Sequence, residues 1–192
     1  FNKMATGDLN GDLQVMTWTD ESDLEKCLME ALCIELGCTE DNLSAVLQHR
    51  LGIDSIKSLA ANPNTIESVQ VLTPVLNPIW GSLHLNECVQ KWIGTYDKEF
   101  IQFSTQKIYP KDKIMQLKNE KVEAYPSHQK YQLSNGQIGF VRSIYKGYAN
   151  LIYAGIPNES FGKRGVSGED SETPIELAYS ITIHKSQGSD FN

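Results

Sequence analysis

The second half of the chain is divided into short apolar runs by turn residues, and this pattern limits the fold more than any other feature. Predicted strands lie at Lys113–Leu117, Gly139–Ile144 and Ala149–Tyr153, with turn residues at Ser134–Gly136 and Lys146–Gly147 between them. Closely spaced strands with such turns are typical of a small antiparallel barrel or meander. We therefore expect a β-rich segment that begins near Lys107.

The first half has a different pattern, in which apolar residues recur at helical spacing. Alternation over Leu13–Trp18 predicts a strand, and a helix follows from Asp20–Ser22 to Gly37, with Ser22 and Glu25 as a capping box. Further elements are expected in this half: helices at Asp41–Leu51 and Ser55–Ala61, a strand at Ser68–Pro74, and a helix capped by Ser82 that buries Leu85, Val89, Trp92 and Ile93.

The end of the chain returns to strand character. We expect a polar, mobile loop over Asn158–Thr173, in which Gly162–Gly165 could touch a phosphate, although an ordinary solvated loop is the preferred interpretation. A strand over Glu176–Ile183 follows and leads directly into His184-Lys185-Ser186-Gln187-Gly188.

Composition excludes several classes of protein. With 192 residues, 40% of them apolar, the chain can bury a real core. A net charge of −7 argues against electrostatic wrapping of nucleic acid, although a narrow contact through amides and hydroxyls stays open. No signal peptide and no apolar run that could span a bilayer is seen. Cys27, Cys33, Cys38 and Cys88 match no zinc spacing, so we interpret them as reduced thiols and expect no metal.

The junction after the last predicted strand carries the most chemistry. A β-branched strand that ends in small and polar residues brings several backbone amides to one point, which favours a phosphate. Thr182 and Ser186 can donate hydroxyl hydrogen bonds, Gln187 offers an amide, Gly188 allows close backbone approach, and Asp190 can accept from a sugar hydroxyl. From the residues alone, a nucleotide-binding edge and an ordinary capped junction are equally good interpretations.

Residues Ala178–Phe191 resemble motif V of superfamily 1 helicases, in particular of the RecD-like branch and the related UvrD C-terminal domains. Gln70–Pro74 and Trp80–Asn86 are similar to the motif IV region of that family. Lys111–Asn119 and the later Asn135–Gly139 resemble two further stretches. The resemblance covers about residues 70–192, and the first third of the chain matches only in position.

The resemblance implies an α/β fold: a second RecA-like motor domain of the P-loop NTPase type, lacking the P-loop itself, with an inserted small Src-homology-3-like barrel. Residues 1–109 would be the first part of the motor domain with a helical lead-in. Residues 110–172 would be the inserted barrel with its polar loop, and residues 173–192 the return strand and motif V.

The resemblance also implies roles for single residues. It assigns to the ATP side Lys185, Gln187, Gly188 and Asp190, and to single-stranded DNA Thr182, His184, Ser186 and Thr73. ATP and Mg²⁺ would be cofactors of the complete protein, with the Mg²⁺ ligands outside this chain. DNA, the missing first RecA-like domain and nuclease or repair subunits would be partners. No membrane contact is expected, and the expected location is the cytoplasm.

The sequence departs from the family pattern in several places. Val75-Leu76-Asn77 lacks the arginine that often follows the motif IV proline, Asp190 replaces the commoner Glu, and Lys111 stands where Gly is usual. The sequence contains no Gly-x-x-x-x-Gly-Lys-Ser/Thr loop, no Asp-Glu motif after a strand and no motif VI with its arginine finger. We therefore expect a fragment of an ATP-dependent DNA helicase that has no catalytic residue of its own and hydrolyses no ATP alone.

Two other functions remain open at this point. A non-catalytic module could use the same fold to bind a protein partner through Tyr145, Tyr148 and Tyr153, although these tyrosines fit cross-strand packing equally well. A hydrolase could use one of the histidines, which are His49, His84, His128 and His184, but no serine elbow or metal spacing accompanies them.

Overall fold

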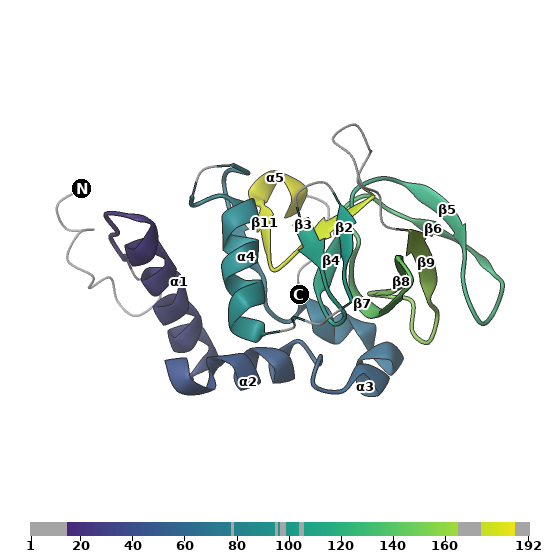
Figure 1. Cartoon of the computed structure of the whole chain (residues 1–192), viewed down its shortest axis with the longest axis horizontal. Coiled ribbons are helices and arrows are strands. Elements are labelled where there is room, and N and C mark those ends of the chain that lie inside the picture. Colours follow the sequence, from purple (N-terminus) through teal and green to yellow (C-terminus); the bar gives the residue numbers. More distant parts are fainter. Residues whose placement is uncertain are drawn as a thin grey trace. The chain divides into compact units, whose positions relative to one another are not determined.

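The computed structural model describes residues 15–77, 79–94, 96, 99–103, 106–164 and 174–186. The chain divides into two compact units, residues 1–43 and 44–192. The first contains α1 (Glu21–Leu36) and the start of α2 (Glu40–Arg50). The second contains the rest of α2 and the other described elements, labelled in Figure 1: α3 (Ile56–Ala61), the 3-10 helix η2 (Pro63–Glu67), β1 (Val71–Thr73), α4 (Ser82–Ile93), β2 (Ile101–Phe103), β3 (Gln106–Ile108), β4 (Lys113–Gln116), β5 (Glu120–Glu123), β6 (Lys130–Leu133), β7 (Ile138–Tyr145), β8 (Tyr148–Tyr153), β9 (Phe161–Arg164), β10 (Ile175–Leu177), β11 (Ser180–Thr182) and α5 (Ile183–Ser186).

The predicted helices are confirmed, with small changes at their ends. The N-cap of α1 is Asp20, whose side chain accepts a hydrogen bond from the amide of Asp23, so the predicted capping box at Ser22 is wrong. Gly37 ends α1 in the left-handed conformation, with φ at 63°. Ser55 caps α3 as its sequence position suggests. In α1 and in α3, a short polar side chain that precedes the helix thus accepts from one of the first amides, which have no partner within the helix.

The strand predicted over Leu13–Trp18 is wrong for the residues that the structure describes. Residues 15–18 adopt no regular structure. A period-two pattern becomes a strand only when another strand offers a hydrogen-bonding partner, and no described strand pairs with this segment.

Two short strands from distant parts of the chain form a parallel pair. β1 and β11 lie side by side, with Leu72 in register with Ile181 and Thr73 with Thr182. α4 packs against β11 and buries Leu85, Val89 and Ile93, as predicted, whereas Trp92 is only half-buried. Its N-cap is Gly81, so the predicted cap Ser82 is instead the first helical residue. Parallel pairing needs a crossover, and here that crossover contains α4 and the whole β-rich segment.

The β-rich segment is built on a five-stranded antiparallel sheet of order β10-β4-β7-β8-β9, which curls in Figure 1. Two hairpins, β2–β3 and β5–β6, form separate two-stranded sheets. The predicted antiparallel meander is therefore present, and β9 forms inside the stretch expected to be a loop. Closure into a Src-homology-3-like barrel stays a prediction, because β9 and β10, at the two ends of the sheet, do not pair in their described residues.

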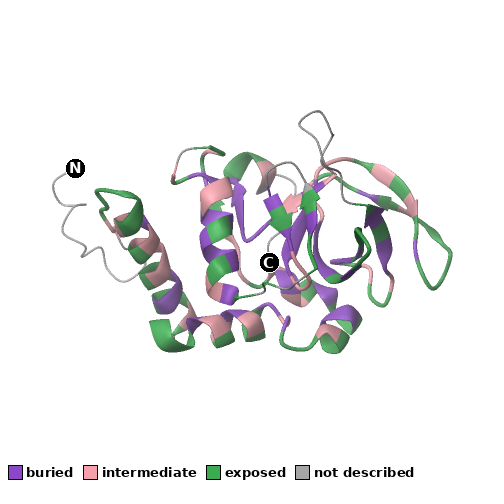
Figure 2. Cartoon of the chain, viewed as in Figure 1, coloured by how far each residue is buried: buried purple, intermediate pink, exposed green. Residues whose placement is uncertain are grey.

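The core of this segment is aromatic and aliphatic. Figure 2 shows buried residues along β7 and β8, and Phe140, Tyr153 and Phe161 are fully buried there. The rings of Tyr153 and Phe161 meet edge to face, with centroids 5.7 Å apart. Tyr153 carries one polar group, and its hydroxyl donates to Oε1 of buried Gln116 at 2.6 Å. Tyr153 is thus a core residue and is not available to a partner.

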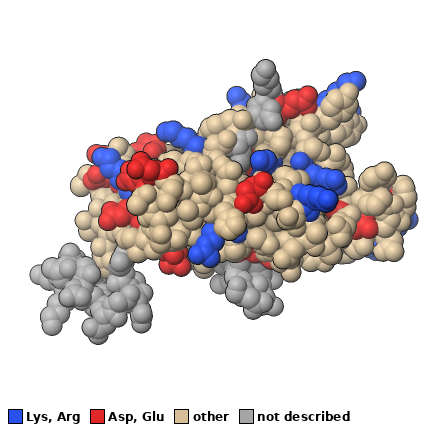
Figure 3. Space-filling model, turned by 90° about the horizontal axis from the view of Figure 1, so that it is seen from below, with Lys and Arg blue, Asp and Glu red and all other residues tan. Residues whose placement is uncertain are grey.

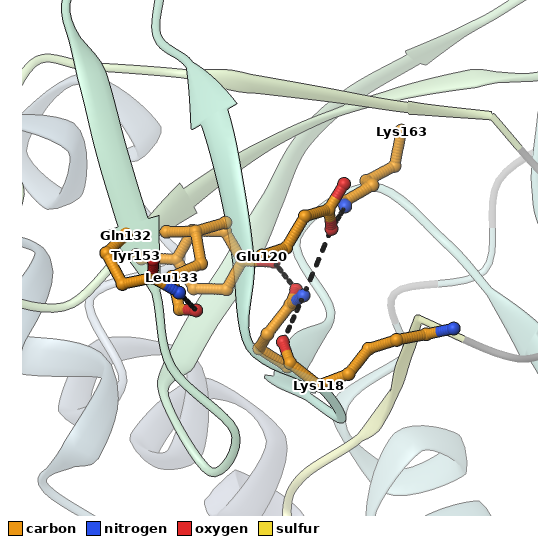
Figure 4. Close-up of polar contacts among 7 residues, drawn as sticks. Lys118, Glu120, Gln132, Leu133, Tyr153 and Lys163 are labelled. Atoms are coloured by element: carbon orange, nitrogen blue, oxygen red, sulfur yellow. Dashed lines mark hydrogen bonds and ion pairs between the residues drawn. The ribbon is translucent and has the colours of Figure 1, made fainter.

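A chain of polar contacts extends from that hydroxyl to the rim of the segment. Gln116 donates to the carbonyl of Lys118 at 2.9 Å and to Glu120 at 3.4 Å, and Glu120 pairs with Lys163 of β9. Figure 4 shows these side chains together, with Lys163 reaching Glu120. Burial raises the pKa of Tyr153, so the phenol stays protonated and donates.

The return segment is not the single strand expected over Glu176–Ile183. β10 pairs antiparallel with β4, and β11 pairs parallel with β1, so the segment belongs to two sheets. Ala178 and Tyr179 separate the two strands, and Ile183 already begins α5. A continuous apolar run hides such a switch, because both halves are buried and no Gly or Pro marks the break.

None of the helices in the described part of the chain is long and apolar enough to cross a membrane.

Candidate functional site

The parallel pair places two of the predicted strand-binding residues next to each other. Thr73 ends β1 and Thr182 ends β11, and the two are partners in the parallel register. Because parallel strands point the same way, the chain leaves both of them at one edge of the sheet. Residues 74–81 follow Thr73, and α5 follows Thr182. This edge, made of Thr73, Thr182 and α5, is called the strand-end edge below.

Both threonines of the edge are buried, and the hydroxyl of Thr73 already has a hydrogen-bond partner within the chain. The hydroxyl of Thr73 donates to the carbonyl of Trp80 at 2.7 Å and thereby fixes the loop before α4. Thr73 is 3% exposed and Thr182 is 9% exposed. Thr73 therefore acts first as a structural residue of the edge, and a contact with DNA through its hydroxyl would require that bond to open.

The first turn of α5 continues the edge with polar residues. His184 is exposed to solvent, and Lys185 is half-buried. The ammonium of Lys185 lies 2.5 Å from Oε1 of Glu176 in β10, so it is paired within the chain. Ser186 is the last residue of α5. The predicted ATP-side residues Gln187, Gly188 and Asp190 lie outside the described residues.

A buried amide holds the backbone that leads to this edge. Asn86 of α4 donates to the carbonyls of Leu177 and Ser180, at 3.0 and 2.9 Å, and its Oδ1 accepts from the amide of Ser180 at 2.7 Å. One side chain therefore joins the end of β10 to the start of β11. Gln70 adds donors to the carbonyls of Ala178 and Tyr179, at 3.2 and 3.1 Å.

A buried carboxylate fixes the residue between the two strands. The hydroxyl of Tyr179 donates to Oδ1 of Asp112 at 2.9 Å. Oδ2 of Asp112 accepts from Gln90 at 2.6 Å and from the amide of Tyr109 at 2.7 Å. Asp112 is fully buried, and these donors compensate for the loss of water around its charge.

The neighbouring residue, Lys113, brings a buried cation to the same region. Its ammonium donates to the carbonyl of Val69, just before β1, at 2.7 Å. Burial lowers the pKa of Lys113 to about 7, against a smaller opposite effect of Glu67. Burial likewise raises the pKa of Glu67. We call Gln70, Asn86, Asp112 and Lys113 the crossover anchors.

The crossover anchors are not among the site residues that the sequence predicts. Each of them lies in a stretch that resembles the helicase family, but the resemblance assigns no function to these four positions. A signal was present for Asn86, which follows Leu85 on the apolar side of a predicted helix. A polar residue at a position expected to be buried needs partners, and here it finds them on the return segment.

The other polar candidates are occupied elsewhere in the fold. In the stretch Gly162–Gly165, where the sequence favours a solvated loop over a phosphate contact, residues 162–164 belong to β9. Lys163 is buried there and pairs with Glu120, and the guanidinium of Arg164 lies 5.7 Å from the ring centre of Tyr148. His49 pairs with Asp54 at 3.0 Å and His128 with Glu123 at 2.7 Å, both on the surface. His84 contacts Cys88, one turn further along α4, at 3.4 Å.

The strand-end edge is suited to binding. Its described residues offer hydroxyls, an imidazole and backbone groups, which are the groups that contact phosphate and sugar in nucleic-acid complexes.

Comparisons with known proteins give limited likeness. No family model and no curated protein matches the chain. A solved structure of two coordinating Pif1 helicases at forked double-stranded DNA is 14% identical over 93% of this chain and 41% of that chain, with a TM-score of 0.40. Pif1 from Bacteroides bound to single-stranded DNA is 15% identical over 91% and 42%, with a TM-score of 0.39. Unliganded Pif1 from Bacteroides sp is 16% identical over 70% and 46%, with a TM-score of 0.37. The chain spans less than half the length of these solved chains, and likeness at this level does not assign it to a family.

Proposed function

We propose that the chain is part of the second RecA-like motor domain of a superfamily 1 DNA helicase of the RecD/UvrD type, and that the strand-end edge is its motif V. The single observation that carries the proposal is the parallel register of Thr73 with Thr182. It joins the ends of the two stretches that resemble motif IV and motif V, which are more than a hundred residues apart in the sequence.

The proposed roles of the edge residues in DNA binding follow from their positions in the fold. Thr182 and His184 would face the phosphates of a single DNA strand, because one ends β11 and the other is exposed in the first turn of α5. Amides and hydroxyls grip a strand without a large positive charge, which is compatible with a net charge of −7. The β-rich segment would be the barrel inserted before motif V.

ATP would lie on the other side of the same turn. Of the predicted ATP-side residues, Lys185 is described, and it pairs with Glu176. It would have to leave that partner to reach a nucleotide phosphate. The chemistry of hydrolysis would come from a phosphate loop and an arginine finger on parts of a longer protein. The Mg²⁺ ion and any repair subunits would bind to those parts as well.

Single-strand binding tests the proposal directly. Fluorescence anisotropy of a labelled oligothymidylate at low ionic strength should detect weak binding by the chain. Changing Thr182→Val together with His184→Ala should weaken it about tenfold, because two contacts to the backbone are lost. Thr182→Val keeps the shape of the side chain, and thermal unfolding checks that β11 stays intact.

The matched control is His49→Ala, which removes an exposed histidine on α2 that pairs with Asp54. We expect it to leave strand binding unchanged. Equal binding by the double variant and the unaltered chain would contradict the proposal, as would equal losses in the double variant and the control.

A second candidate function, a protein-binding module, has one observation in its favour. Tyr145 and Tyr148 are cross-strand partners at the β7–β8 turn and are 63% and 52% exposed. Cations lie over both rings, Lys146 over Tyr145 at 5.2 Å and Arg164 over Tyr148 at 5.7 Å. Such exposed aromatic residues are typical of interfaces, but this function predicts no loss of strand binding on changing Thr182 and His184.

A further inference from the structure

A pocket of about 700 Å³ opens between α3 and the β-rich segment, away from the strand-end edge. Its lining includes the apolar residues Ile56, Ala60 and Pro126. In Figure 1, α3 lies at the lower edge of the second unit and α5 at its upper edge, so the pocket is separate from the proposed motif V.

Among the described residues that line the pocket, two are cationic and none is acidic. Lys57 of α3 and Arg142 of β7 both line it, and both are exposed. Neither takes part in an ion pair with any residue that the structure describes, whereas Lys163 and Lys185 do. The view from below shows a group of Lys and Arg side chains on this side of the molecule (Figure 3). Two unpaired cations at one pocket, on a chain of net charge −7, favour an anion there.

A β-bulge accounts for the position of Arg142. The pairing of β7 with β8 shifts between Val141 and Ser143, so Arg142 has no partner in that ladder. A bulge of this kind re-aims one side chain out of the alternation of the strand. Here the re-aimed side chain is a guanidinium, which is suited to bidentate contact with a phosphate.

The rim carries a flat aromatic surface and an amide. Tyr125 is 67% exposed and lines the pocket together with Asn158. An exposed tyrosine ring offers a face on which a planar base can stack, and a side-chain amide can bond to the edge of the base. Cations with an adjacent aromatic face therefore match a nucleotide better than they match a simple anion.

The walls of the pocket are tied together by backbone hydrogen bonds. The amide of Asn158 donates to the carbonyl of Ala60 at 2.8 Å, and Tyr125 exchanges two hydrogen bonds with Ser160 at 2.9 and 2.8 Å. The amide of Gly155 adds a bond to Asn64 at 2.7 Å. Since the backbone groups of Tyr125 are already paired, a peptide could not add there as a further strand. The remaining mode of binding is recognition of a compact ligand by the side chains of the pocket.

We propose that this pocket binds a phosphate-bearing nucleotide, with the phosphate at Lys57 and Arg142 and the base on Tyr125. The ligand is either a free nucleoside monophosphate or one unit of a single strand, since both present the same groups. This proposal does not depend on the proposed motor function, and a separate experiment tests it.

Amide chemical-shift mapping of the whole chain locates the binding directly. Adenosine monophosphate at millimolar concentration should shift the resonances of Ala60, Tyr125 and Arg142 more than that of His184. Inorganic phosphate should shift them with an affinity at least about tenfold weaker. An oligothymidylate that binds here more tightly than the mononucleotide identifies the strand as the source, and the reverse order identifies the free nucleotide.

Paired variants decide whether the cations and the ring act as proposed. Lys57→Gln with Arg142→Gln should weaken binding of the mononucleotide more than about tenfold, and Tyr125→Leu should abolish its advantage over inorganic phosphate. Lys121→Gln with Lys130→Gln changes the net charge equally on the β5–β6 hairpin and should have little effect.

Three results would overturn the proposal. The first is the absence of shifts at Ala60, Tyr125 and Arg142 with the mononucleotide and with the oligonucleotide. The second is an equal loss of binding in the two double variants. The third is tighter binding of an oligoglutamate peptide than of either nucleotide probe, which would assign the pocket to an acidic peptide instead.

Discussion

The core of the β-rich segment and the crossover between β10 and β11 are both buried, but they are held together in different ways. Around Phe140, Tyr153 and Phe161, apolar side chains fill space and the polar groups lie at one margin. At the crossover, Gln70 and Asn86 bond to backbone carbonyls of the return segment, and Asp112 accepts from the hydroxyl of Tyr179. The first region is therefore stabilised mainly by the shape complementarity of its side chains, and the second mainly by directional hydrogen bonds. Buried backbone groups that have no partner in a β-sheet need side-chain partners instead.

The strongest test of the shape-dependent region is Gly139→Ala. A Cβ at this position would lie 2.4 Å from the carbonyl oxygen of Ile152, a backbone atom that cannot turn aside. We expect the free energy of unfolding to fall by more than about 3 kcal/mol, beyond ordinary overpacking. Gly162→Ala is the matched control, because nothing lies within 4 Å of a Cβ there. Denaturant unfolding that showed equal effects for the two variants would mean that close packing does not control this region.

The direction-dependent region is tested by Asn86→Ala. The change leaves the carbonyls of Leu177 and Ser180 and the amide of Ser180 without this partner in a buried place. Unsatisfied buried groups cost about 1–3 kcal/mol each, and partial relaxation should leave a net loss of about 3 kcal/mol. Asn150→Ala removes an exposed asparagine that bonds to Ser143 and should cost much less. A loss in Asn86→Ala as small as in this control would remove the contrast between the two regions.

A smaller effect, dependent on pH, should distinguish the two regions further. The folded pKa of Lys113, about 7, is below the ordinary value of 10.5, so the unfolded chain binds more protons between these values. Stability should therefore rise with pH, by about 2 kcal/mol from about pH 6 to about pH 8.5. The raised pKa of Glu67 has the opposite effect from about pH 4.5 upward, and the raised pKa values of Cys33, Tyr96 and Tyr153 act only above their ordinary values of 9.0 and 10.0.

Unfolding of Lys113→Met at several pH values checks this expectation. The variant should lose most of the rise, since it has no ammonium to bury. Lys121→Met removes an exposed ammonium on β5 and should keep the rise of the unaltered chain. A rise of the same size in Lys113→Met would show that other groups set the pH dependence of the crossover.

Much of the fold could be predicted from local signals. Asp20 and Ser55 follow capping rules, Gly37 ends a helix, and alternation with turn residues located β4, β7 and β8. The hairpins β2–β3 and β5–β6 were missed because their strands are short and rich in charged or polar residues. The strand pattern could not show that β10 and β11 belong to different sheets, since both are mostly buried and no Gly or Pro separates them.

The candidate sites could be predicted only where a motif or a pattern pointed to them. The resemblance drew attention to Thr182 and His184, but the register that places Thr73 beside Thr182 is a property of the fold. The pocket at Lys57 and Arg142 has no sequence signal, because the two residues are distant in the chain and a bulge sets the direction of one of them. The predicted roles of Gln187, Gly188 and Asp190 stay predictions.

The short link between β10 and β11 has a mechanical consequence. Only Ala178 and Tyr179 stand between a strand of the curled sheet and a strand of the parallel pair. Asp112, just before β4, and Gln70, just before β1, bond to this link, and Asn86 of α4 bonds to Leu177 beside it. A force on α5 is therefore transmitted through this short backbone link to the five-stranded sheet, because no flexible loop lies between them. Whatever force acts at the end of β11, the β-rich segment must share the displacement.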